Sequence, residues 1–410
     1  MGPAPAILAD VRKEEDGSCV LSVVAEDAQA VAAGLQDGSL SIQDFGTEDP
    51  RVDFLMQMIL CQSPPPPIRV QFRLEKEAEP VVEAQSTGKL ASLGPNTDDY
   101  FESYGDLTVH ELMLKDAPRM SAYRDAIEKN KHLFEGRTVL DVGSGSGVLA
   151  MWCARAGART VYAVEASGMA RMARTLVAHN GLDQVVRVIE EAVENVELPE
   201  KVDIIVSEWM GFHLLHESML NSVVRARDRW LRPGGTVFPG RCDIVACPVT
   251  MERLRGKRRE ELAFWSDVGG GLDFSPLGDE LAAQDHGAPL VECIEPAQLL
   301  AAPRALISFD CASVSEAELN TVTGEAPFCA ARAGDAAGVA VWFECHFDGG
   351  TDGSQVVLST APDQAPTHWK QSIVLLGGFV PVQPGDDMSL RLTLQQDERN
   401  PRHYRVSVVT

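Results

Sequence analysis

Two glutamates in an apolar segment have the spacing that most directly suggests chemistry. Glu208 and Glu217 stand nine positions apart and bracket the segment WMGFHLLH. Such a loop is expected to be packed, and two carboxylates held in it repel each other unless a cation lies between them. A guanidinium suits that position, because it is planar and offers five donors that pair with carboxylates. The two glutamates therefore predict a guanidinium-binding site rather than a pair of surface charges.

A glycine-rich turn earlier in the chain could bind a cofactor. The segment VLDVGSGSG is typical of a strand that enters a turn and then a helix, and Gly143, Gly145 and Gly147 let the backbone approach a ligand closely. A dinucleotide is expected to use G-x-G-x-x-G, whereas here the third glycine comes one residue early. Asp141, before the turn, suits the cationic amino-acid part of S-adenosylmethionine better than a diphosphate.

Two more acidic residues follow the next predicted strands. Glu165 ends the segment VYAVEA about twenty residues after the turn, where a carboxylate can accept hydrogen bonds from both ribose hydroxyls of either cofactor. Glu194 follows the third strand and could accept a hydrogen bond from an adenine amino group. Taken singly, each is better explained as a solvated loop end. Together with the glycine spacing, they favour adenosylmethionine over a nicotinamide cofactor.

The two features together predict a methyl transfer. Arginine is a poor nucleophile, because its lone pairs are delocalised and its pKa exceeds about 12. Paired carboxylates can hold one terminal nitrogen in line with the sulfonium methyl group and draw positive charge away from it. The gain in rate would come mainly from positioning and electrostatics, and a proton would leave during or after the transfer.

Between Tyr100 and about Pro239 the sequence alternates short β-branched segments with helical ones. This alternation predicts a Rossmann-like α/β fold, a parallel-rich sheet with covering helices. Ligands bind beyond the carboxyl ends of such strands, so the glycine turn and the glutamate loop are expected at one edge. The segment WLRPGG at 230–235 predicts a helix stop and a turn. The predicted strands are RTVLDVG, RTVYAVEA, VVRVIEE and VDIIVSEW, and the predicted helices are GVLAMWCARAG and SGMARMARTLVAHNG.

Strands separated by Gly, Pro and Asp turns follow Pro239 and predict a β-sandwich or β-barrel-like half. One insertion, at about 250–288, is expected to be helical with exposed charge. We therefore expect an N-terminal accessory region of unknown role (1–90), a cofactor-binding domain (91–240) and a β-barrel-like domain (241–410) that carries the insertion. The predicted strands of the last domain are CDIVACPV, RALISFDC, GVAVWFECHF, SQVVLSTAP, KQSIVLL, MSLRLTL and HYRVSVVT.

The first 90 residues carry the least information. CVLSVVAE and IRVQFRLEKE are typical of strands, and VDFLMQMIL of a short apolar helix. The segment SPPPP at 63–67 must be extended, and is better explained as a stiff linker than as a ligand for a proline-binding domain. The polar stretch EAQSTGKLASLGPNTDDY is expected to lead into the main body.

The 410 residues carry a net charge of −24 and nine cysteines. So acidic a chain repels nucleic-acid phosphates and attracts cationic partners, although acidity can also serve solubility alone. No C-x-x-C pair is present, which argues against a structural zinc site. An odd cysteine count without a secretory signal favours a reducing compartment, cytoplasmic or nuclear. No segment approaches the roughly 18 apolar residues of a membrane span.

Five motifs together resemble those of the protein arginine N-methyltransferases: YFESY (100–104), VLDVGSGSG, YAVEA, SEWMG with ESM, and THW (367–369). The chain is most similar to the type I branch, which makes asymmetric dimethylarginine. The resemblance runs from Tyr100 to the C-terminus, about three quarters of the chain. It implies S-adenosylmethionine as cofactor and a homodimer in which the insertion is the dimerisation arm. It also implies basic or Arg/Gly-rich protein substrates, such as histone tails and RNA-binding proteins.

The resemblance implies catalytic roles by position. Glu208 and Glu217 match the catalytic glutamate pair. His368 of the THW segment resembles the histidine that pairs with an aspartate, here Asp116, and helps to carry off the proton. Met113 matches the residue whose shape helps to decide which nitrogen receives the second methyl group.

The resemblance also implies contacts with the cofactor. Tyr100, Phe101 and Tyr104 resemble the N-terminal helix that folds over it, and Arg119 is placed to pair with the methionine carboxylate. Phe212 departs from the family, because most relatives carry a tyrosine there, and this loss of a hydroxyl leaves the fine substrate geometry open. The other implied cofactor contacts are those of His110, Gly143, Gly145, Glu165 (ribose) and Glu194 (adenine).

Three other interpretations stay open. A non-catalytic scaffold or regulatory subunit on the same fold would be expected to lose Glu208 or Glu217, a glycine of the cofactor turn, or His368 of the THW segment. All of these residues are present. A small-molecule methyltransferase would need a closed pocket and would have no use for the barrel or the THW segment. A nicotinamide oxidoreductase is disfavoured by the glycine spacing.

Overall fold

The chain divides into two compact units, Met1–Gln85 and Ser86–Thr410. The computed structural model describes residues 8–13, 19–25, 68–74, 100–101, 103–278, 280, 289–348 and 355–409. The division of the second unit at residue 240 into two domains stays a prediction. Within the described residues, no helix combines the length and the apolar character needed to cross a membrane.

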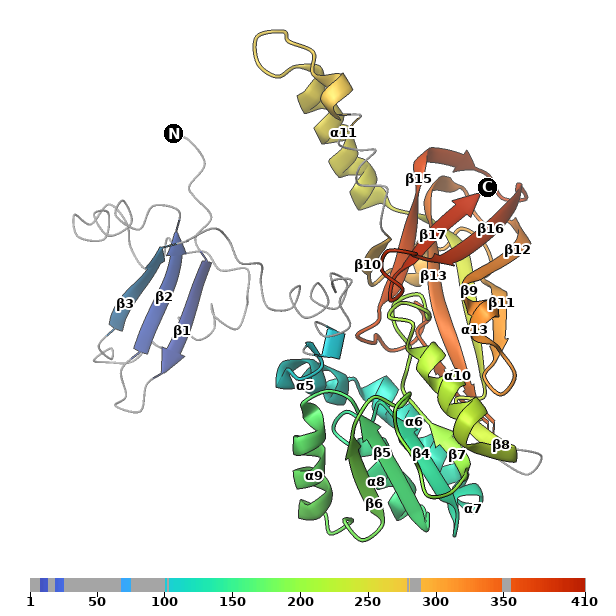
Figure 1. The fold of residues 1–410 in the computed structure, drawn as a ribbon. Helices are drawn as coiled ribbons and strands as arrows, with labels where there is room; N and C mark the ends of the chain where they lie inside the picture. The colour runs from blue at the N-terminus through green and yellow to red at the C-terminus, as the bar shows by residue number, and fades with distance from the viewer. Residues whose placement is uncertain are drawn as a thin grey trace. The chain divides into compact units, whose positions relative to one another are not determined.

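The first unit contains a three-stranded sheet in the order β1-β2-β3 (Figure 1). β1 pairs antiparallel with β2, and β3 pairs parallel with β2. The strands predicted in CVLSVVAE and IRVQFRLEKE are confirmed, whereas the first strand was not predicted. The predicted helix VDFLMQMIL, the proline segment and the linker lie outside the described residues. The bounds are β1 Leu8–Lys13, β2 Cys19–Ala25 and β3 Ile68–Leu74.

A five-stranded parallel sheet in the order β6-β5-β4-β7-β8 forms the first half of the second unit (Figure 1). β4 and β5 are buried along their whole length, which is why both are β-branched runs without alternation. The chain reverses its direction of winding between β4 and β7, and such a switch point is where α/β sheets bind ligands. The bounds are β4 Thr138–Val142, β5 Thr160–Glu165, β6 Val186–Glu190, β7 Val202–Val206, β8 Leu231–Phe238, α8 Val148–Arg155, α9 Met169–His179 and α10 Met219–Trp230.

The segment WLRPGG does not form a free turn. α10 ends at Trp230 as predicted, but β8 begins at the next residue and pairs with β7. Between the pairs made by Leu231 and Thr236 the register shifts, and Gly234 adopts a φ of +75°. The proline and glycines are therefore accommodated as an irregularity inside a strand, a feature that bulges permit.

Before the parallel sheet, the described residues include Tyr100, Phe101 and Ser103 in helical conformation, which we call the N-terminal helix. They are followed by α5 (Leu107–Lys115), α6 (Ala117–Lys129) and α7 (Lys131–Phe134). The Tyr123 hydroxyl of α6 donates to the carbonyl of Ser207 at 2.9 Å, just beyond β7. Its ring meets that of Phe347, from the second half of the unit, at 4.8 Å. One buried tyrosine thus connects α6, the end of β7 and the antiparallel half.

The antiparallel half contains a six-stranded sheet and a three-stranded sheet. Every strand predicted after Pro239 is confirmed, and with them the fold class: a Rossmann-like sheet followed by a β-rich domain. β10 and β12 were not predicted, because β10 is very short and β12 contains Gly324 and Pro327, which weaken a strand pattern. The bounds are β9 Arg241–Thr250, β10 Leu290–Glu292, η2 Pro296–Gln298, β11 Arg304–Asp310, α13 Glu316–Leu319, β12 Thr321–Cys329, β13 Gly334–Phe347, β14 Val356–Ser359, β15 Gln371–Val382, β16 Asp387–Gln396 and β17 Tyr404–Val409.

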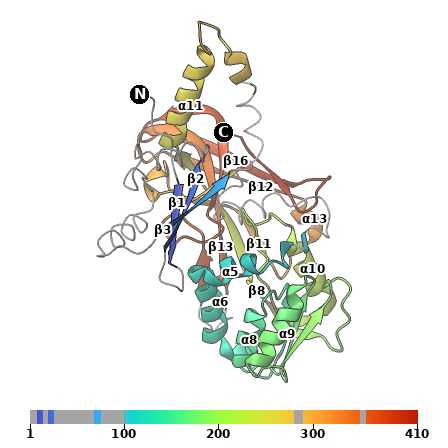
Figure 2. The same cartoon turned by 90° about the vertical axis from the view of Figure 1, so that its left-hand side faces the viewer.

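The predicted helical insertion contains α11 (Glu252–Ser266), which projects away from the antiparallel strands in two perpendicular views (Figures 1 and 2). Phe264 is 56% exposed and Leu272 is 59% exposed. Phe274 and Leu277 are also exposed, and several exposed apolar side chains in one segment make it a candidate interaction surface.

Candidate active site

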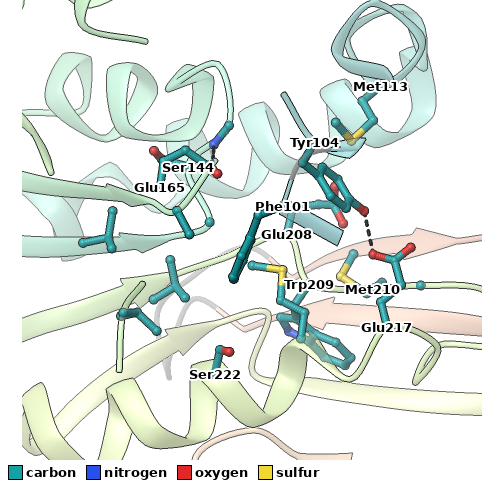
Figure 3. A pocket seen from close by; sticks show the side chains of 18 of the residues that line it. Phe101, Tyr104, Met113, Ser144, Glu165, Glu208, Trp209, Met210, Glu217 and Ser222 are labelled. Carbon is teal, nitrogen blue, oxygen red and sulfur yellow. Dashed lines mark hydrogen bonds between the residues drawn. The ribbon is translucent and has the colours of Figure 1, made fainter. Parts of the chain in front are cut away.

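A cavity of about 350 Å³ lies at the switch point, beyond the ends of β4 and β7. It has the size of a small-molecule site. Figure 3 shows it with Ser144 and Glu165 on one side and Tyr104 and Glu217 on the other. Of the residues proposed from the sequence, Asp116, Asp141 and Gly147 do not line it. The others do: Tyr100, Phe101, Tyr104, His110, Met113, Arg119, Gly143, Gly145, Glu165, Glu194, Glu208, Glu217 and His368.

The glycine turn is fixed by Glu165. One oxygen of this carboxylate accepts from the backbone N–H of Gly145 at 2.7 Å, and the other accepts from Ser167 at 2.8 Å. Gly143 and Gly145 have φ values of +68° and +51°, a region that side-chain-bearing residues rarely adopt. The His110 ring lies over the turn, because a Cβ on Gly145 would be 3.0 Å from its Cε1 atom. The turn therefore forms a cradle for a ligand in which positions 143 and 145 favour glycine.

Asp141 does not line the cavity, and the expectation that it faces a cofactor needs correction. Its side chain is fully buried and accepts a hydrogen bond from the Ala150 N–H in α8 at 3.0 Å. Burial raises the pKa of its carboxyl to about 8, and the bond from Ala150 opposes that shift. The side chain leaves β4 toward α8, so it anchors the helix behind the turn.

Arg119 and Glu208 form a buried ion pair on the cavity wall. Nε and Nη2 of the guanidinium donate to the same oxygen, Oε2, at 2.9 and 2.7 Å, and Nη1 donates to the Met113 carbonyl at 2.9 Å. The two side chains are only 8% and 10% exposed. Among the described residues, no donor contacts the other oxygen of Glu208, so the ion pair leaves part of this carboxylate available.

Glu217 accepts a hydrogen bond from the Tyr104 hydroxyl at 2.6 Å (Figure 3). Burial raises the pKa of its carboxyl to about 7. Hydrogen bonds from Tyr104 and Tyr100 lower that pKa, the charge of Glu208 raises it, and the charge of Arg402 lowers it. The site therefore holds two carboxylates close enough to interact, in surroundings that disfavour a second negative charge.

Asp116 does not line the cavity but contacts a residue that does. Its Oδ2 atom accepts from the His368 backbone N–H at 2.9 Å and lies 2.6 Å from Nδ1 of the same residue. Its Oδ1 atom accepts from the Arg119 N–H at the start of α6, at 3.0 Å. The pKa of Asp116 is lowered by these bonds, which outweigh its burial. One carboxylate thus orients both the histidine and the helix that presents Arg119.

Glu194 and Met113 also line the cavity, and each has a contact of its own. Glu194 accepts from the Ser222 hydroxyl at 2.6 Å. Met113 packs against the cluster formed by Tyr100, Val109 and Phe212. Phe212 thus packs against Tyr100 and Val109, and it also lines the cavity.

Sequence reasoning missed Arg402, which lines the cavity from the loop between β16 and β17. Its guanidinium carbon lies 3.6 Å from the centre of the Tyr100 ring. Met219 and Ser222, on the first turns of α10, were also missed as lining residues. Met219 stands in the ESM motif, but Arg402 belongs to no motif that could have indicated it.

Two family models match this chain. One is described as a methyltransferase domain and covers residues 139–235; the other is described as the arginine methyltransferase oligomerization subdomain and covers residues 249–409. The chain is 39% identical over 330 residues to protein arginine N-methyltransferase 6 of Danio rerio. The matched region covers 79% of this chain and 93% of that protein. The chain belongs to the protein arginine N-methyltransferase family.

Solved structures of arginine methyltransferases share its fold. The crystal structure of Arabidopsis thaliana protein arginine methyltransferase 10, in an open conformation, matches with a TM-score of 0.68 at 37% identity, covering 75% of this chain and 93% of that chain. A chain of the Trypanosoma brucei PRMT1 enzyme–prozyme heterotetrameric complex with AdoHcy matches with a TM-score of 0.69 at 36% identity, covering 75% and 94%. The shared arginine methyltransferase architecture includes the sheet and the antiparallel half.

The glycine cradle generates a prediction about Gly143→Ala. A Cβ at Gly143 would lie 2.1 Å from Cε of Met219, so alanine must displace that side chain and would also strain the backbone by about 1–3 kcal/mol. We expect a lower melting temperature and an affinity for AdoHcy, measured by calorimetry, that falls at least about tenfold. Gly181→Ala is the control, since Gly181 has φ +69° with nothing within 4 Å. Equal AdoHcy affinity in the two variants would contradict the prediction that the glycine turn contacts the cofactor.

Proposed function

We propose that this chain transfers methyl groups from S-adenosylmethionine to the guanidino nitrogens of arginine in proteins, giving monomethylarginine and asymmetric dimethylarginine. One observation carries the proposal: Glu208 and Glu217 line the same cavity as the glycine turn and Glu165. The two glutamates, which we call the clamp for a guanidinium, and the glycine turn, which we call the cradle for a cofactor, therefore face the same cavity. Family membership supports the reaction class.

The residues of the cavity fit S-adenosylmethionine, which supplies an electrophilic methyl group when bound. The glycine turn allows close approach of the backbone, and each oxygen of Glu165 uses one lone pair on a backbone N–H, which leaves others for ribose hydroxyls. Glu194 would accept from the adenine amino group. Arg119 retains one N–H donor, on Nη2, for the methionine carboxylate, since its other donors contact Glu208, Met113 and Met120. Phe101 and Tyr104 would cover the cofactor from the N-terminal helix, with His110 beneath them.

The clamp would work through charge and position. Glu208, already oriented by Arg119, would accept from the substrate guanidinium through its available oxygen. Glu217 would accept from the same guanidinium and hold one nitrogen in line with the methyl group. Localising the positive charge away from that nitrogen frees its lone pair for attack. The His368–Asp116 pair would receive the proton that leaves the methylated nitrogen.

The type I product, the substrates and the assembly also belong to this proposal. Met113 lines the cavity beside the N-terminal helix, where its shape would favour a second methyl group on the same nitrogen. The charge of −24 would favour basic or Arg/Gly-rich substrates, such as histone tails and RNA-binding proteins. The oligomerization subdomain and the exposed apolar residues of the arm support a homodimer. A cytoplasmic or nuclear compartment stays a prediction.

Incubation with labelled adenosylmethionine and histone or Gly/Arg-rich peptides tests the proposal directly. Amino-acid analysis should recover monomethylarginine first and asymmetric dimethylarginine later. The KM for a basic peptide should rise with salt, because screening weakens the attraction of an acidic enzyme for its substrate. Absence of methylarginine would refute the reaction, exclusively symmetric product would refute the type I assignment, and a salt-independent KM would refute charge-guided capture.

Glu208→Gln should separate chemistry from cofactor binding. The amide keeps the shape of the side chain but cannot neutralise a guanidinium, so kcat should fall by about 100- to 1,000-fold. AdoHcy affinity should change by less than about threefold, since Arg119 keeps its other contacts. Glu111→Gln, on the exposed face of α5 and paired with Lys115, is the charge-matched control and should keep full activity. Retained activity in Glu208→Gln would remove this residue from the clamp.

The raised pKa of Glu217 predicts how the rate depends on pH. Below about 7 the carboxyl is largely protonated and cannot hold a cation, so kcat/KM for an arginine peptide should rise with pH through about 7 and level off above it. Measurement of kcat/KM between about pH 5.5 and 9 would reveal this fall in rate on the acidic side, which we call the acid limb. In Glu217→Gln the residual rate should lack it. A variant that keeps the same limb would show that another group controls it.

A further inference from the structure

The loop between β16 and β17, residues 397–403, holds the second clamp glutamate from the antiparallel half. The Glu217 N–H donates to the Arg402 carbonyl at 2.6 Å, and Nη1 of Arg402 donates back to the Glu217 carbonyl at 3.3 Å. The Ser218 hydroxyl donates to the Pro401 carbonyl at 2.5 Å. Gln396, at the end of β16, donates to that same carbonyl at 2.6 Å. These contacts join segments about 180 residues apart in the sequence.

Glu217 needs such support because its backbone conformation is unfavourable. Glu217 and Ser218 have φ values of +76° and +56°, and such left-handed conformations in residues other than glycine persist only when their surroundings enforce them. His403 adds a further contact, since its ring stacks on that of His216 at 4.7 Å. The β16–β17 loop therefore contacts the glutamate loop through the backbone, a hydroxyl and a ring.

Arg402 also holds the N-terminal helix. Its guanidinium carbon lies 3.6 Å from the centre of the Tyr100 ring and 5.4 Å from that of Phe101. The hydroxyl of Tyr104, in the turn that follows this helix, donates to Glu217. One side chain thus contacts the segment that covers the cofactor end of the cavity and the residue that faces the guanidinium end.

We propose that Arg402 is a positioning residue, which fixes Glu217 in its clamp conformation and couples that conformation to closure of the N-terminal helix over the cofactor. The proposal rests on the function proposed above. Arg402 acts through Glu217 and Tyr100, by two hydrogen bonds to the strained backbone and by a cation–π contact with the ring.

The charge of Arg402 adds a second effect. Glu217 faces the hydroxyls of Tyr100 and Tyr104, the carboxylate of Glu208 and the guanidinium of Arg402. Arg402 is the only cation among these four groups. Removing its charge should therefore raise the pKa of Glu217 further above its usual value, and a larger fraction of the enzyme would be inactive at neutral pH.

Arg402→Met and Arg402→Lys test the proposal, with Arg399→Met as the control. Arg399 lies in the same loop with its side chain exposed, so its replacement removes the same charge without touching the cavity. For Arg402→Met we expect kcat/KM to fall by about 10- to 100-fold, AdoHcy affinity to fall several-fold, and the acid limb to move to higher pH. Arg402→Lys should return the limb to its wild-type position and recover the rate only in part. The control should match the wild type.

Three results would overturn the proposal. Arg402→Met could match the control in rate and in its acid limb. It could also lose rate equally at every pH, as a general loss of folding would give. If Arg402→Met does not fold, Arg402→Lys decides, and a lysine variant with wild-type kcat and AdoHcy affinity would show that the planar stack is not needed. A wild-type chain that methylates no arginine would instead refute the proposed function, so the two failures are distinguishable.

Discussion

The burial of two like charges at one edge of the parallel sheet is the constraint on which the rest of the site depends. A buried carboxylate without a partner costs several kcal/mol, so the fold must compensate Glu208 and Glu217 individually. Arg119 compensates the first through two bonds to one oxygen, and the Tyr104 hydroxyl compensates the second. The compensation is incomplete, because one oxygen of Glu208 has no donor among the described residues and the pKa of Glu217 stays near 7. The cavity is therefore a place where a planar cation with several donors is favoured.

This electrostatic requirement explains why the antiparallel half is part of the site. Trp369 donates to the Met210 carbonyl at 2.8 Å and so supports the middle of the glutamate loop. His368, its neighbour, pairs with Asp116 at the start of α6. The parallel sheet alone would place Glu208 at the end of β7, but it could not hold Glu217 in a left-handed conformation. The cradle belongs to the parallel sheet, whereas the clamp needs both halves of the unit.

Much of this arrangement could be predicted from the sequence, because it depends on local patterns. The central strands β4, β5 and β7 are largely apolar, and the glycine turn and Glu208 stand directly after β4 and β7, so the switch-point rule brings them together. Asp141 shows the limit of that reasoning: it also stands near a strand end, but its side chain leaves the strand toward α8. β12 was missed because a glycine and a proline interrupt its pattern, and its pairing with β16 overrides that local signal.

Arg402 could not be predicted, because its role comes from a tertiary contact between residues 185 positions apart. Nothing near it in the sequence indicates that its guanidinium meets an aromatic ring of the N-terminal helix. The two hydrogen bonds of Tyr104, one at the glycine turn and one at Glu217, also depend on tertiary contacts that the sequence does not indicate. The Tyr104 carbonyl contacts His110 Nε2 at 2.9 Å beside the glycine turn, while its hydroxyl donates to Glu217. A ligand that orders this helix at the cradle would also fix the hydrogen bond at the clamp. Because such coupling is reciprocal, a guanidinium held by Glu217 would in turn stabilise the closed helix over the cofactor.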